Sequence, residues 1–494
     1  METMRDATQP STLKPDTEPR GHASADLLWI GLVLFVILLI AFLLPIPPND
    51  YWWYVRFGQD TVRDGAIPRV DTLSYTQAGR PVIAHAWLSA VIYGVLDEAG
   101  GATLTVLVHG LVLASFYFFL WLACRRVGAG PKAAALATLL AALAGSNNWA
   151  VRPQIFAYPL YGVALWALCC WRQRQNNRLW LLPLATALWF NLHPSFVLIF
   201  LIVGAALVFG EGDRRALLWT LGAMVLASWV NPDGPLGWVN AFVPLRYQNF
   251  GTEWYPPVNS GWQMNLFFGW ILIFAPLLAL SGKRVSRMHW SWFLGLGWLA
   301  LSGERYVIWF LAILAILSAE LLASKIGARL DRPVVRTFPA LNLALVGLLL
   351  VMPLAVLPGV RQRWWADAPP VLTPNTPVAA AQWLAQHPEL PGPLWSDYIF
   401  SSYLTYALPE RPVWIDTRFF PFPPEQWERY LAISDARPGW EDMLTEEGAA
   451  LLLIDVKGQS RLLDALEHSP GWREIYRDTV AAIFVREDAG GSAP

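Results

Sequence analysis

The sequence is poor in charge and in cysteine. Only 15% of its 494 residues are charged, whereas soluble domains carry about 25%. Together with a hydrophobic content of 55%, this deficit excludes an ordinary soluble protein and indicates a polytopic membrane protein. The formal net charge of −1 gives no electrostatic preference for nucleic acid. All three cysteines lie in or beside apolar runs, which excludes a cysteine metal site or a disulfide framework in the C-terminal region.

Several motifs of common enzymes are also missing. The sequence has no P-loop, no Gly-x-Gly-x-x-Gly, no His-Glu-x-x-His and no Gly-x-Ser-x-Gly. The stretch after the first apolar run has no Asp-x-Asp, so a tightly bound divalent metal is not indicated, and we expect no cofactor. We expect no cleavable signal peptide, because the first apolar run is too long and lacks a small-residue cleavage site.

Apolar runs fill most of the first 358 residues. The first run, Leu27–Ile46, is uncharged and long enough to cross a bilayer as a helix. We predict a disordered cytosolic tail over residues 1–25 and a transmembrane domain over residues 26–358 with about eleven helices. His193-Pro194 favours a turn between two of these spans. The other ten runs are 102–123, 133–146, 153–171, 179–192, 194–210, 216–230, 262–280, 290–302, 304–323 and 337–357.

The basic residues alternate between loops. With the N-terminus in the cytosol, every predicted inner loop holds several Lys or Arg, whereas the later outer loops hold only Arg152, Arg246 and Arg305. This bias matches the positive-inside rule. It places the loop over residues 47–101, which contains interfacial helices, and the whole C-terminal region outside the cytosol.

The composition changes after Pro358. Residues 359–494 contain no run long enough to span a membrane, and the segment that begins with Arg361 and includes Trp364 and Trp365 has the composition of an interfacial anchor. Strands and helices alternate beyond it, which predicts a small soluble α/β domain. The expected strands are 393–395, 412–415, 450–454, 472–476 and 480–485, the last two as a hairpin, and the expected helices are 398–406, 425–433, 439–447 and 459–468.

Asp50 is the leading candidate for chemistry. It follows the first apolar run and precedes Tyr51-Trp52-Trp53. A carboxylate next to the apolar bilayer costs free energy, so its presence there indicates a functional role. Apolar surroundings would raise its pKa toward that of a general base, which takes a proton from an acceptor hydroxyl. The structural alternative is that Asn49 or Asp50 caps the next helix.

That next helix is predicted over Tyr51–Arg63 at the membrane surface. Its charged residues then have two interpretations: Arg56 either belongs to a solvated face or meets a phosphate through its planar fork of donors. The predicted membrane-facing side chains are Tyr51, Trp52, Val55 and Val62, and the predicted water-facing ones are Arg56, Asp60 and Arg63.

Two further candidates follow in the same loop. Asp71 comes after a turn centred on Pro68, which favours a capping role, with a second acidic site residue as the alternative. His85 precedes Trp87 at the start of the helix that leads into the second span. The imidazole of His85 would bind a phosphate, bind a metal or simply lie at the interface.

Polar residues also stand at the outer ends of several spans. In the predicted topology they all face the side of Asp50 and together would line one outward-facing cavity. Arg152 and Arg305 are the expected phosphate ligands, although Glu304 and Arg305 would alternatively form a structural ion pair. The set consists of Arg152, Gln154, Asn191, His193, Asn231, Asp233, Glu253, Trp254, Glu304 and Arg305.

A resemblance to a known superfamily rests on these motifs. The sequence resembles bacterial membrane proteins grouped with the GT-C glycosyltransferases, and the resemblance covers nearly the whole chain. The matching segments are Asn49-Asp50-Tyr51-Trp52-Trp53, Gly58-Gln59, Gly65-Ala66-Ile67-Pro68, Asp71, Ser74-Tyr75, His85-Ala86-Trp87-Leu88, Arg152-Pro153-Gln154, Asn191-Leu192-His193, Asn231-Pro232, Glu253-Trp254, Glu304-Arg305 and Trp414-Ile415-Asp416-Thr417-Arg418.

The resemblance implies a function in the bacterial inner membrane. It implies transfer of a sugar from a polyprenyl-phosphate-type donor to a glycan, lipid or protein acceptor on the outer face. Asp50 would be the general base and Asp71 a second acidic residue. The metal-dependent branch uses a carboxylate pair without a match here, so an inverting, metal-independent reaction is expected. The implied substrate-binding residues are Arg56, His85, Trp87, Arg152, His193, Glu253 and Arg305.

Two other classes of protein fit the same composition. A transporter or flippase for a lipid-linked glycan would hold polar residues near the bilayer midplane and show paired halves, and no repeat is visible. A non-catalytic scaffold would bind a partner or glycan through the C-terminal domain. Its contact surface would include Asp416, Arg418, Phe419 and Phe420.

Overall fold

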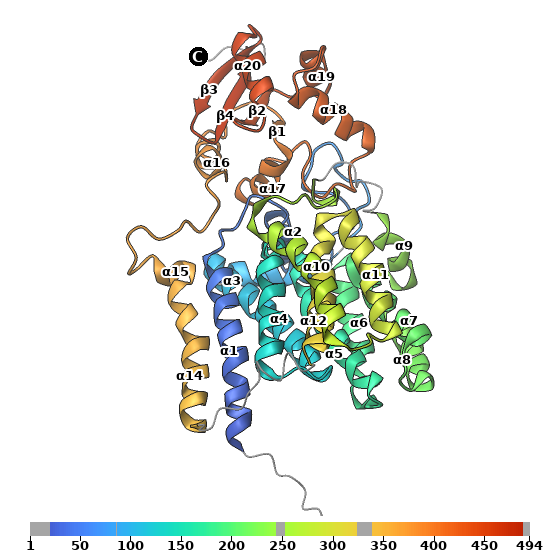
Figure 1. The fold of residues 1–494 in the computed structure, drawn as a ribbon. Coiled ribbons are helices and arrows are strands. Elements are labelled where there is room, and N and C mark those ends of the chain that lie inside the picture. Colours follow the sequence, from blue (N-terminus) through green and yellow to red (C-terminus); the bar gives the residue numbers. More distant parts are fainter. Residues whose placement is uncertain (1–19, 85, 244–251, 324–337, 488–494) are drawn as a thin grey trace, which may run out of the picture.

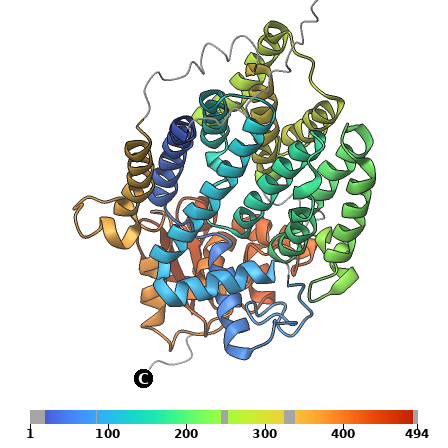
Figure 2. The same cartoon turned by 90° about the horizontal axis from the view of Figure 1, so that it is seen from below.

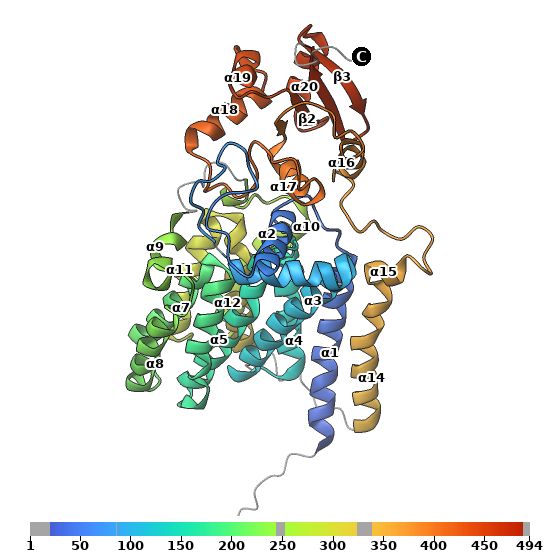
Figure 3. The same cartoon turned by 180° about the vertical axis from the view of Figure 1, so that it is seen from behind.

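The computed structural model describes residues 20–84, 86–243, 252–323 and 338–487. It consists of a helical bundle with a small α/β domain at one end (Figure 1). The helix α1 begins at Arg20, so residues 20–25 of the predicted tail are helical. The start of α1 and the α/β domain lie at opposite ends of the bundle (Figures 1 and 3).

Each of the predicted apolar runs contains a helix of the bundle. These helices are α1 (Arg20–Leu43), α3 (Trp87–Arg126), α4 (Pro131–Ala144), α5 (Ala157–Arg172), α6 (Leu181–Leu192), α7 (Val197–Phe209), α8 (Arg214–Ala227), α10 (Gly261–Ser281), α11 (Arg287–Ser302), α12 (Val307–Leu322) and α14 (Pro339–Val351). Among the described residues, 6 helical segments are long and apolar enough to cross a membrane. The crossing count of about eleven stays a prediction.

The break at His193-Pro194 is confirmed. Helix α6 ends at Leu192, a short 3₁₀ helix follows over Pro194–Phe196, and α7 begins at Val197. Proline starts this turn because its fixed φ suits the first helical position and its missing N–H costs nothing there. The small helix α9 (Gly237–Ala241) lies beyond α8.

Loops that the charge pattern assigned to one side of the membrane meet at one end of the bundle. Arg125 Nη2 at the end of α3 lies 3.0 Å from Asp26 Oδ2 near the start of α1. Arg172 Nη1 at the end of α5 lies 3.0 Å from Glu320 Oε1 near the end of α12. These contacts place the ends of α3, α5 and α12 and the start of α1 as the charge pattern groups them, while the topology in the membrane stays a prediction.

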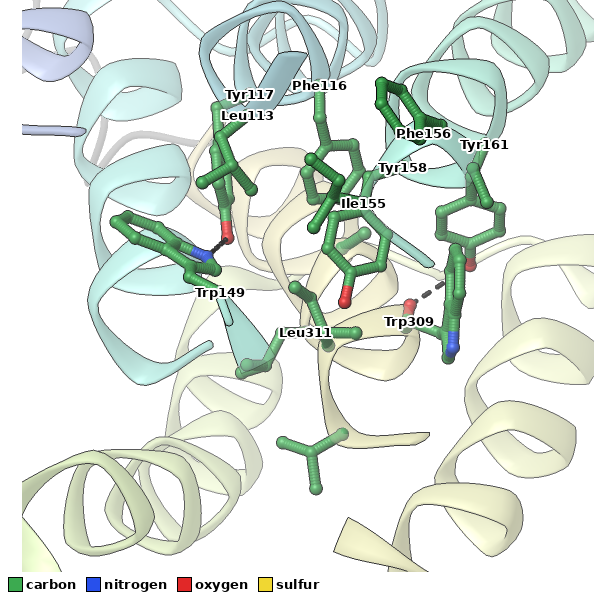
Figure 4. Close-up of a cluster of buried hydrophobic side chains, with 14 of the residues drawn as sticks. Leu113, Phe116, Tyr117, Trp149, Ile155, Phe156, Tyr158, Tyr161, Trp309 and Leu311 are labelled. Carbon is green, nitrogen blue, oxygen red and sulfur yellow. Dashed lines mark hydrogen bonds between the residues drawn. The ribbon is translucent and has the colours of Figure 1, made fainter. Parts of the chain in front are cut away.

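An aromatic core fills the space between α3, α5 and α12 (Figure 4). The Trp149 indole donates a hydrogen bond to the Tyr117 hydroxyl over 3.1 Å, and the Tyr161 hydroxyl donates to the Trp309 carbonyl over 3.0 Å. These rings are buried, and the Trp149 indole and the two tyrosine hydroxyls are paired, as buried polar groups must be to avoid a desolvation cost. The core thus fixes Trp309, whose ring also reaches the functional site described below.

Helix α14 runs beside α1 at the edge of the bundle (Figures 1 and 2). Only 6% of its apolar window is buried within the protein. Leucine and valine side chains cover its exposed surface, which suits contact with lipid tails rather than with water.

Arg361 is not part of an interfacial anchor, contrary to the prediction. Its side chain is buried, and its guanidinium donates to the carbonyls of Phe42, Pro369 and Pro370 over 2.7, 2.8 and 3.0 Å. A planar guanidinium offers several donors at once, so it satisfies carbonyls that would otherwise lack partners. Arg361 therefore ties the end of α1 to the linker that enters the α/β domain. Trp364 remains exposed, as an anchor requires.

Helix α2 (Tyr51–Asp64) follows the first span, but it is not a surface helix with one wet face. It packs between the first half of α3 and α17 (Tyr398–Ala407) of the α/β domain. Asp60 was expected in water and is instead buried, where it pairs with Arg56 over 2.9 Å. Val62, expected at the membrane, is exposed.

The first half of α3 lies across the end of the bundle, and the second half runs through it (Figure 3). The change of direction occurs at Gly101, whose φ of 58° and ψ of −152° are accessible essentially to glycine alone. Glycines also permit close contact between α2 and α3. A Cβ at Gly58 would lie 1.9 Å from the Ala90 carbonyl oxygen, and one at Gly94 would lie 2.7 Å from the Gln59 nitrogen.

The α/β domain contains a four-stranded sheet of order β1-β2-β4-β3. Strand β1 is parallel to β2, and the other pairs are antiparallel, with Leu453 opposite Ile483. Its elements are α16 (Val378–Ala385), β1 (Leu394–Ser396), α17 (Tyr398–Ala407), α18 (Pro424–Ser434), α19 (Trp440–Glu446), β2 (Leu451–Asp455), α20 (Ser460–His468), β3 (Trp472–Arg477) and β4 (Ala481–Arg486), whereas the short helix α15 (Pro358–Arg361) follows α14 beside the bundle (Figure 1).

All the predicted elements of this domain are confirmed except the strand at 412–415. Val413 forms only isolated bridges, to Leu394 and to Ser74 of the loop after α2. Its backbone exchanges hydrogen bonds with that loop, because Val413 N donates to the Leu73 carbonyl and Tyr75 N donates to the Val413 carbonyl, each over 3.1 Å. The segment therefore joins the domain to the loop over residues 47–101.

We expect Gly58→Ala to destabilise the protein by about 3 kcal/mol, at the upper end of the usual cost of overpacking, because its Cβ would collide with backbone rather than with a movable side chain. The melting temperature of the purified chain in detergent measures the effect. Gly204→Ala in α7 is the matched control, since a Cβ there meets no atom within 4 Å. Equal melting temperatures for both variants would contradict the close contact between α2 and α3.

Candidate functional site

A cleft lies where the bundle meets the α/β domain. It encloses about 1030 Å³ of space free of atoms, open solvent included. Its walls come from α2, from the break between α6 and α7, from the segments before α10 and α12, and from the loop after Val413. The lining residues are Asp50, Trp53, Tyr54, Gln154, His193, Pro194, Ser195, Glu253, Trp254, Arg305, Tyr306, Trp309, Thr417, Arg418, Phe419 and Phe420.

Asp50 is one of the residues that line this cleft. It occupies the position before α2, but its side chain accepts no hydrogen bond from the helix backbone, so Asp50 does not cap this helix. Asn49, the other residue of the capping alternative, accepts from Tyr51 N at the start of α2 through its Oδ1 over 3.4 Å. The hydroxyl of Thr417, from the α/β domain, lies close enough to the Asp50 carboxylate to influence it, and it also lies 2.7 Å from Ser402 Oγ.

Burial raises the pKa of Asp50 above its ordinary value of 3.8. The hydrogen bond from Thr417 acts in the opposite direction, the charge of Glu253 raises the pKa further, and the charges of Arg152 and Arg305 lower it. The net result is a carboxyl group whose proton affinity is shifted upward, as a general base that works near neutral pH requires.

Glu253 holds two arginines at the cleft. Its carboxylate pairs with Arg152 and, at 2.8 Å from Oε1, with Arg305 Nη1. Burial alone would raise the pKa of Glu253, but the charges of Arg152 and Arg305 outweigh it and hold the pKa at about 2. The carboxylate is therefore ionised at any physiological pH, and the three residues together carry a net positive charge.

Arg305 is the arginine of this group that lines the cleft. Its guanidinium lies 4.0 Å from the centroid of the Trp254 ring, a cation–π contact that fixes its plane. The alternative of a Glu304–Arg305 ion pair is wrong, because Glu304 Oε1 accepts instead from Asn147 Nδ2 over 2.7 Å. Arg152 does not line the cleft itself, but it pairs with Glu253, which does.

His193 has a defined hydrogen-bonding pattern. Its Nδ1 accepts from the Ser195 backbone N–H over 3.1 Å and lies 2.7 Å from Ser195 Oγ, which in turn accepts from the Trp189 indole over 3.1 Å. Because Nδ1 is an acceptor, this network assigns the proton of the neutral ring to Nε2. Its position at the cleft suits a donor to an anionic or hydroxyl group of a ligand.

Arg418 joins the α/β domain to the loop after α2. Its Nη1 and Nη2 lie 2.8 and 3.1 Å from the two carboxylate oxygens of Asp71, and its Nη2 lies 2.7 Å from Asp416 Oδ2. All three side chains are buried. A buried guanidinium needs such bidentate partners, since its desolvation is otherwise uncompensated.

Asp71 therefore takes a structural position and does not line the cleft. Its Oδ1 accepts from Leu73 N over 2.9 Å, and its Oδ2 accepts from Ser74 Oγ over 2.5 Å, which forms the turn cap that the sequence favoured. Burial would raise the pKa of Asp71, but the charge and hydrogen bonds of Arg418 outweigh it and lower the pKa.

Two other predicted residues lie away from the cleft, and one lies outside the described residues. Arg56 pairs with Asp60 within α2. The Trp87 indole donates to Asn191 Oδ1 over 2.7 Å beside a smaller cavity. His85 is the residue outside the described part of the chain.

The structure adds residues that sequence reasoning had not selected for the cleft. Thr417 and Phe419 come from the segment that the sequence had offered as a scaffold surface, and Trp53 had appeared only as a motif member, whereas Gln154 lines the cleft as expected. Phe419 has a φ of 57°, which is rare for a bulky residue, and its ring stacks on Trp427 with centroids 4.7 Å apart. One feature of the sequence could have indicated that this segment belongs to a site. Asp416 and Arg418 are charged and directly follow the apolar residues Trp414 and Ile415.

In the part of the chain that the structure describes, no group of three or more His, Cys, Asp or Glu is placed to hold a metal ion. The expectation of a metal-independent reaction stays a prediction.

Comparison with known proteins identifies the fold. No family model and no curated protein matches the sequence. Among solved structures, the oligosaccharyltransferase of Archaeoglobus fulgidus, tethered with an acceptor peptide, is similar over 94% of this chain and 74% of its own, with 14% identity and a TM-score of 0.58. The arabinofuranosyltransferase AftD from Mycobacteria is similar over 94% and 40%, with 16% identity and a TM-score of 0.58.

A third similar structure is ArnT from Cupriavidus metallidurans bound to undecaprenyl phosphate. It matches over 95% of this chain and 100% of its own, with 15% identity and a TM-score of 0.51. The chain thus has the fold of these GT-C glycosyltransferases, and 6 of its described helical segments are long and apolar enough to cross a membrane. The resemblance that the sequence motifs indicated is confirmed at the level of the fold.

We expect Asp71→Ala to cost about 3–5 kcal/mol of stability, the usual penalty for breaking a buried ion pair, because Arg418 would stay buried with Asp416 as its remaining acidic partner. Thermal melting of the purified protein measures this loss. Asp64→Ala is the control, because Asp64 pairs with Arg63 on an exposed surface and should leave the melting temperature unchanged. A normal melting temperature together with lost activity would instead favour the predicted catalytic role for Asp71.

Proposed function

We propose that this protein transfers a sugar from a polyprenyl-phosphate-type donor to an acceptor hydroxyl. The observation that carries the proposal is the placement of Asp50 and Arg305 on one cleft: a carboxylate of raised pKa and a guanidinium face the same space. The fold shared with ArnT bound to undecaprenyl phosphate supports a lipid-phosphate donor. Aromatic side chains such as Trp254 and Tyr306 supply apolar faces on which a sugar ring packs.

The proposed reaction uses the two sides of the cleft differently. The acceptor oxygen attacks the anomeric carbon while Asp50 takes the hydroxyl proton. The bond from the anomeric carbon to the phosphate oxygen breaks, and the polyprenyl phosphate leaves with the electron pair. Arg305, with Arg152 behind Glu253, stabilises the negative charge of the leaving phosphate. Attack opposite to the leaving group gives inversion at the anomeric carbon.

The arrangement in the membrane follows from the same proposal. With the N-terminus in the cytosol of a bacterium and about eleven crossings of the inner membrane, the cleft and the α/β domain lie on the outer face. The acceptor is then a glycan, a lipid or a protein on that face. A transporter would need polar residues along a path through the bundle, whereas the described cleft gathers them at one end.

The proposal predicts separate effects for Arg305 and Asp50. We expect Arg305→Gln to weaken binding of undecaprenyl phosphate by about 10- to 100-fold, the usual range for a charge-assisted hydrogen bond. Asp50→Asn should retain binding and lose at least about 100-fold in transfer rate, as expected for a general base. Binding is measured on the full chain in lipid nanodiscs, and transfer with undecaprenyl-phosphate pentoses and hexoses.

Arg69→Gln is the matched control for this experiment, because Arg69 is an exposed arginine that pairs with Asp233 and does not line the cleft. It should leave undecaprenyl phosphate binding unchanged. Failure of the parent chain to bind the lipid, or full transfer activity of Asp50→Asn, would overturn the proposed function.

The hydrogen bond from Thr417 gives a prediction about pH. Asp50 must be unprotonated to accept a proton, so the rate falls as the pH drops through its pKa. Thr417 lowers the pKa of Asp50, so Thr417→Val should raise that pKa and move the acid limb of the kcat/KM profile to higher pH. Thr417→Ser keeps the hydroxyl and should keep the parent profile. An acid limb that is identical in Thr417→Val and the parent chain would show that Thr417 does not act on the base.

A further inference from the structure

Two residues that line the cleft each carry one buried polar atom without a hydrogen-bond partner among the described residues. They are the indole nitrogen Nε1 of Trp53, a donor, and the amide oxygen Oε1 of Gln154, an acceptor. Trp53 is 5% exposed and Gln154 is 2% exposed, and both residues line the cleft. Neither atom takes part in the proposed proton transfer or in phosphate binding.

A buried polar atom without a hydrogen-bond partner destabilises the folded protein. A buried donor or acceptor without a partner loses about 1–3 kcal/mol, and more than about 90% of buried polar groups in proteins are paired. Unpaired indole nitrogens also occur at Trp121 and Trp395, in the apolar packing away from the cleft. Trp53 and Gln154 differ from these because both residues line the cleft.

Both side chains are held in place by their surroundings. Trp53 lies three positions after Asp50, one turn along α2, so the two share a face of the helix. Its ring stacks on Tyr54 with a centroid distance of 3.5 Å. Gln154 lies in the 3₁₀ helix Pro153–Phe156, directly after Arg152. The two unpaired atoms therefore belong to residues adjoining the candidate base and the arginine cluster.

We infer that Trp53 and Gln154 recognise hydroxyl groups of the sugar carried by the lipid donor. A sugar hydroxyl accepts a hydrogen bond through its oxygen and donates one through its hydrogen, so it complements both an indole N–H and an amide carbonyl. The inference rests on the proposed function, in which the sugar lies between the base and the phosphate-binding arginines. Trp53 and Gln154 then determine which sugar is bound, while Arg305 binds the phosphate of any polyprenyl donor.

This division of roles predicts which lipid each variant affects. The parent chain should bind at least one lipid of an undecaprenyl-phosphate pentose and hexose panel more tightly than bare undecaprenyl phosphate. Gln154→Met, which keeps the size but removes the amide, should weaken binding of that sugar lipid by about tenfold or more, because one hydrogen bond to a buried polar group is lost. Binding of bare undecaprenyl phosphate should not change.

Trp53 is tested in the same way with two replacements. Trp53→Phe removes the indole N–H, and benzothienylalanine at position 53 replaces the nitrogen with sulfur while it keeps the ring shape. Both should weaken binding of the sugar lipid selectively. Trp121→Phe is the matched control, since it makes the same change at a buried, unpaired indole that does not line the cleft, and it should affect neither lipid.

The outcomes separate this inference from the proposed function. If the parent chain binds neither lipid, the proposed function fails, and the inference fails with it. If it binds bare and sugar-bearing lipids equally, or if the Gln154 and Trp53 variants weaken both lipids alike, the hydroxyl subsite is wrong while lipid-phosphate binding stands. Selective loss of sugar-lipid binding in Gln154→Met, with a parent-like melting temperature, supports the inference even if Trp53→Phe does not fold.

Discussion

The guanidinium of Arg418 lies between carboxylates from opposite ends of the chain, and the cleft depends on this contact. Asp71 belongs to the loop after α2, Asp416 to the α/β domain, and 347 positions separate Asp71 from Arg418. The Asp71–Arg418 ion pair is buried, so removal of one partner would leave the other charge buried without full compensation. It fixes the segment that brings Thr417 against Asp50 and Phe419 and Phe420 into the cleft wall. The α/β domain is therefore part of the site rather than a cover over it.

The two ion clusters near the cleft have opposite balances of charge. Glu253 is shared by Arg152 and Arg305, so positive charge is in excess on the side where the proposal places a phosphate. Arg418 is shared by two aspartates, so this cluster between the loop and the α/β domain has no excess of positive charge. The first cluster borders the cleft through Glu253 and Arg305, and the second borders it through Arg418, whose guanidinium is already shared by two aspartates. This difference explains why two superficially similar arginine networks have different expected roles.

The fold supplies the rigidity that these clusters need. Glycines at positions 58 and 94 let α2 lie against α3 at a distance that any larger side chain would prevent. The kink at Gly101 turns α3 from the end of the bundle into its interior. Below the cleft, the aromatic core around Trp309 joins α5 and α12 (Figure 4). Asp50 and Trp53 are thus held by backbone packing, not by flexible surface contacts.

The sequence by itself determined the helical bundle, the α/β domain and the end of the molecule where the site lies. Runs of uncharged apolar residues suffice for this, because helix formation in a membrane depends on local composition and length. The same pattern grouped Asp50, Glu253 and Arg305 on one side, and the structure places all three on one cleft. Most elements of the α/β domain could also be predicted, because each has a local hydrophobic period, but helix α16 was not predicted and the segment 412–415 is not a strand.

Only the tertiary structure decided which polar residues meet. The burial of Asp60 and Arg361, the Asp71–Arg418 pair and the contact of Thr417 with Asp50 all join side chains whose surroundings come from distant segments. No local period encodes such contacts, because they depend on how close two backbones approach and on which face each helix turns inward. The unpaired atoms of Trp53 and Gln154 are of the same kind, since a polar atom lacks a partner only with respect to the complete packing around it.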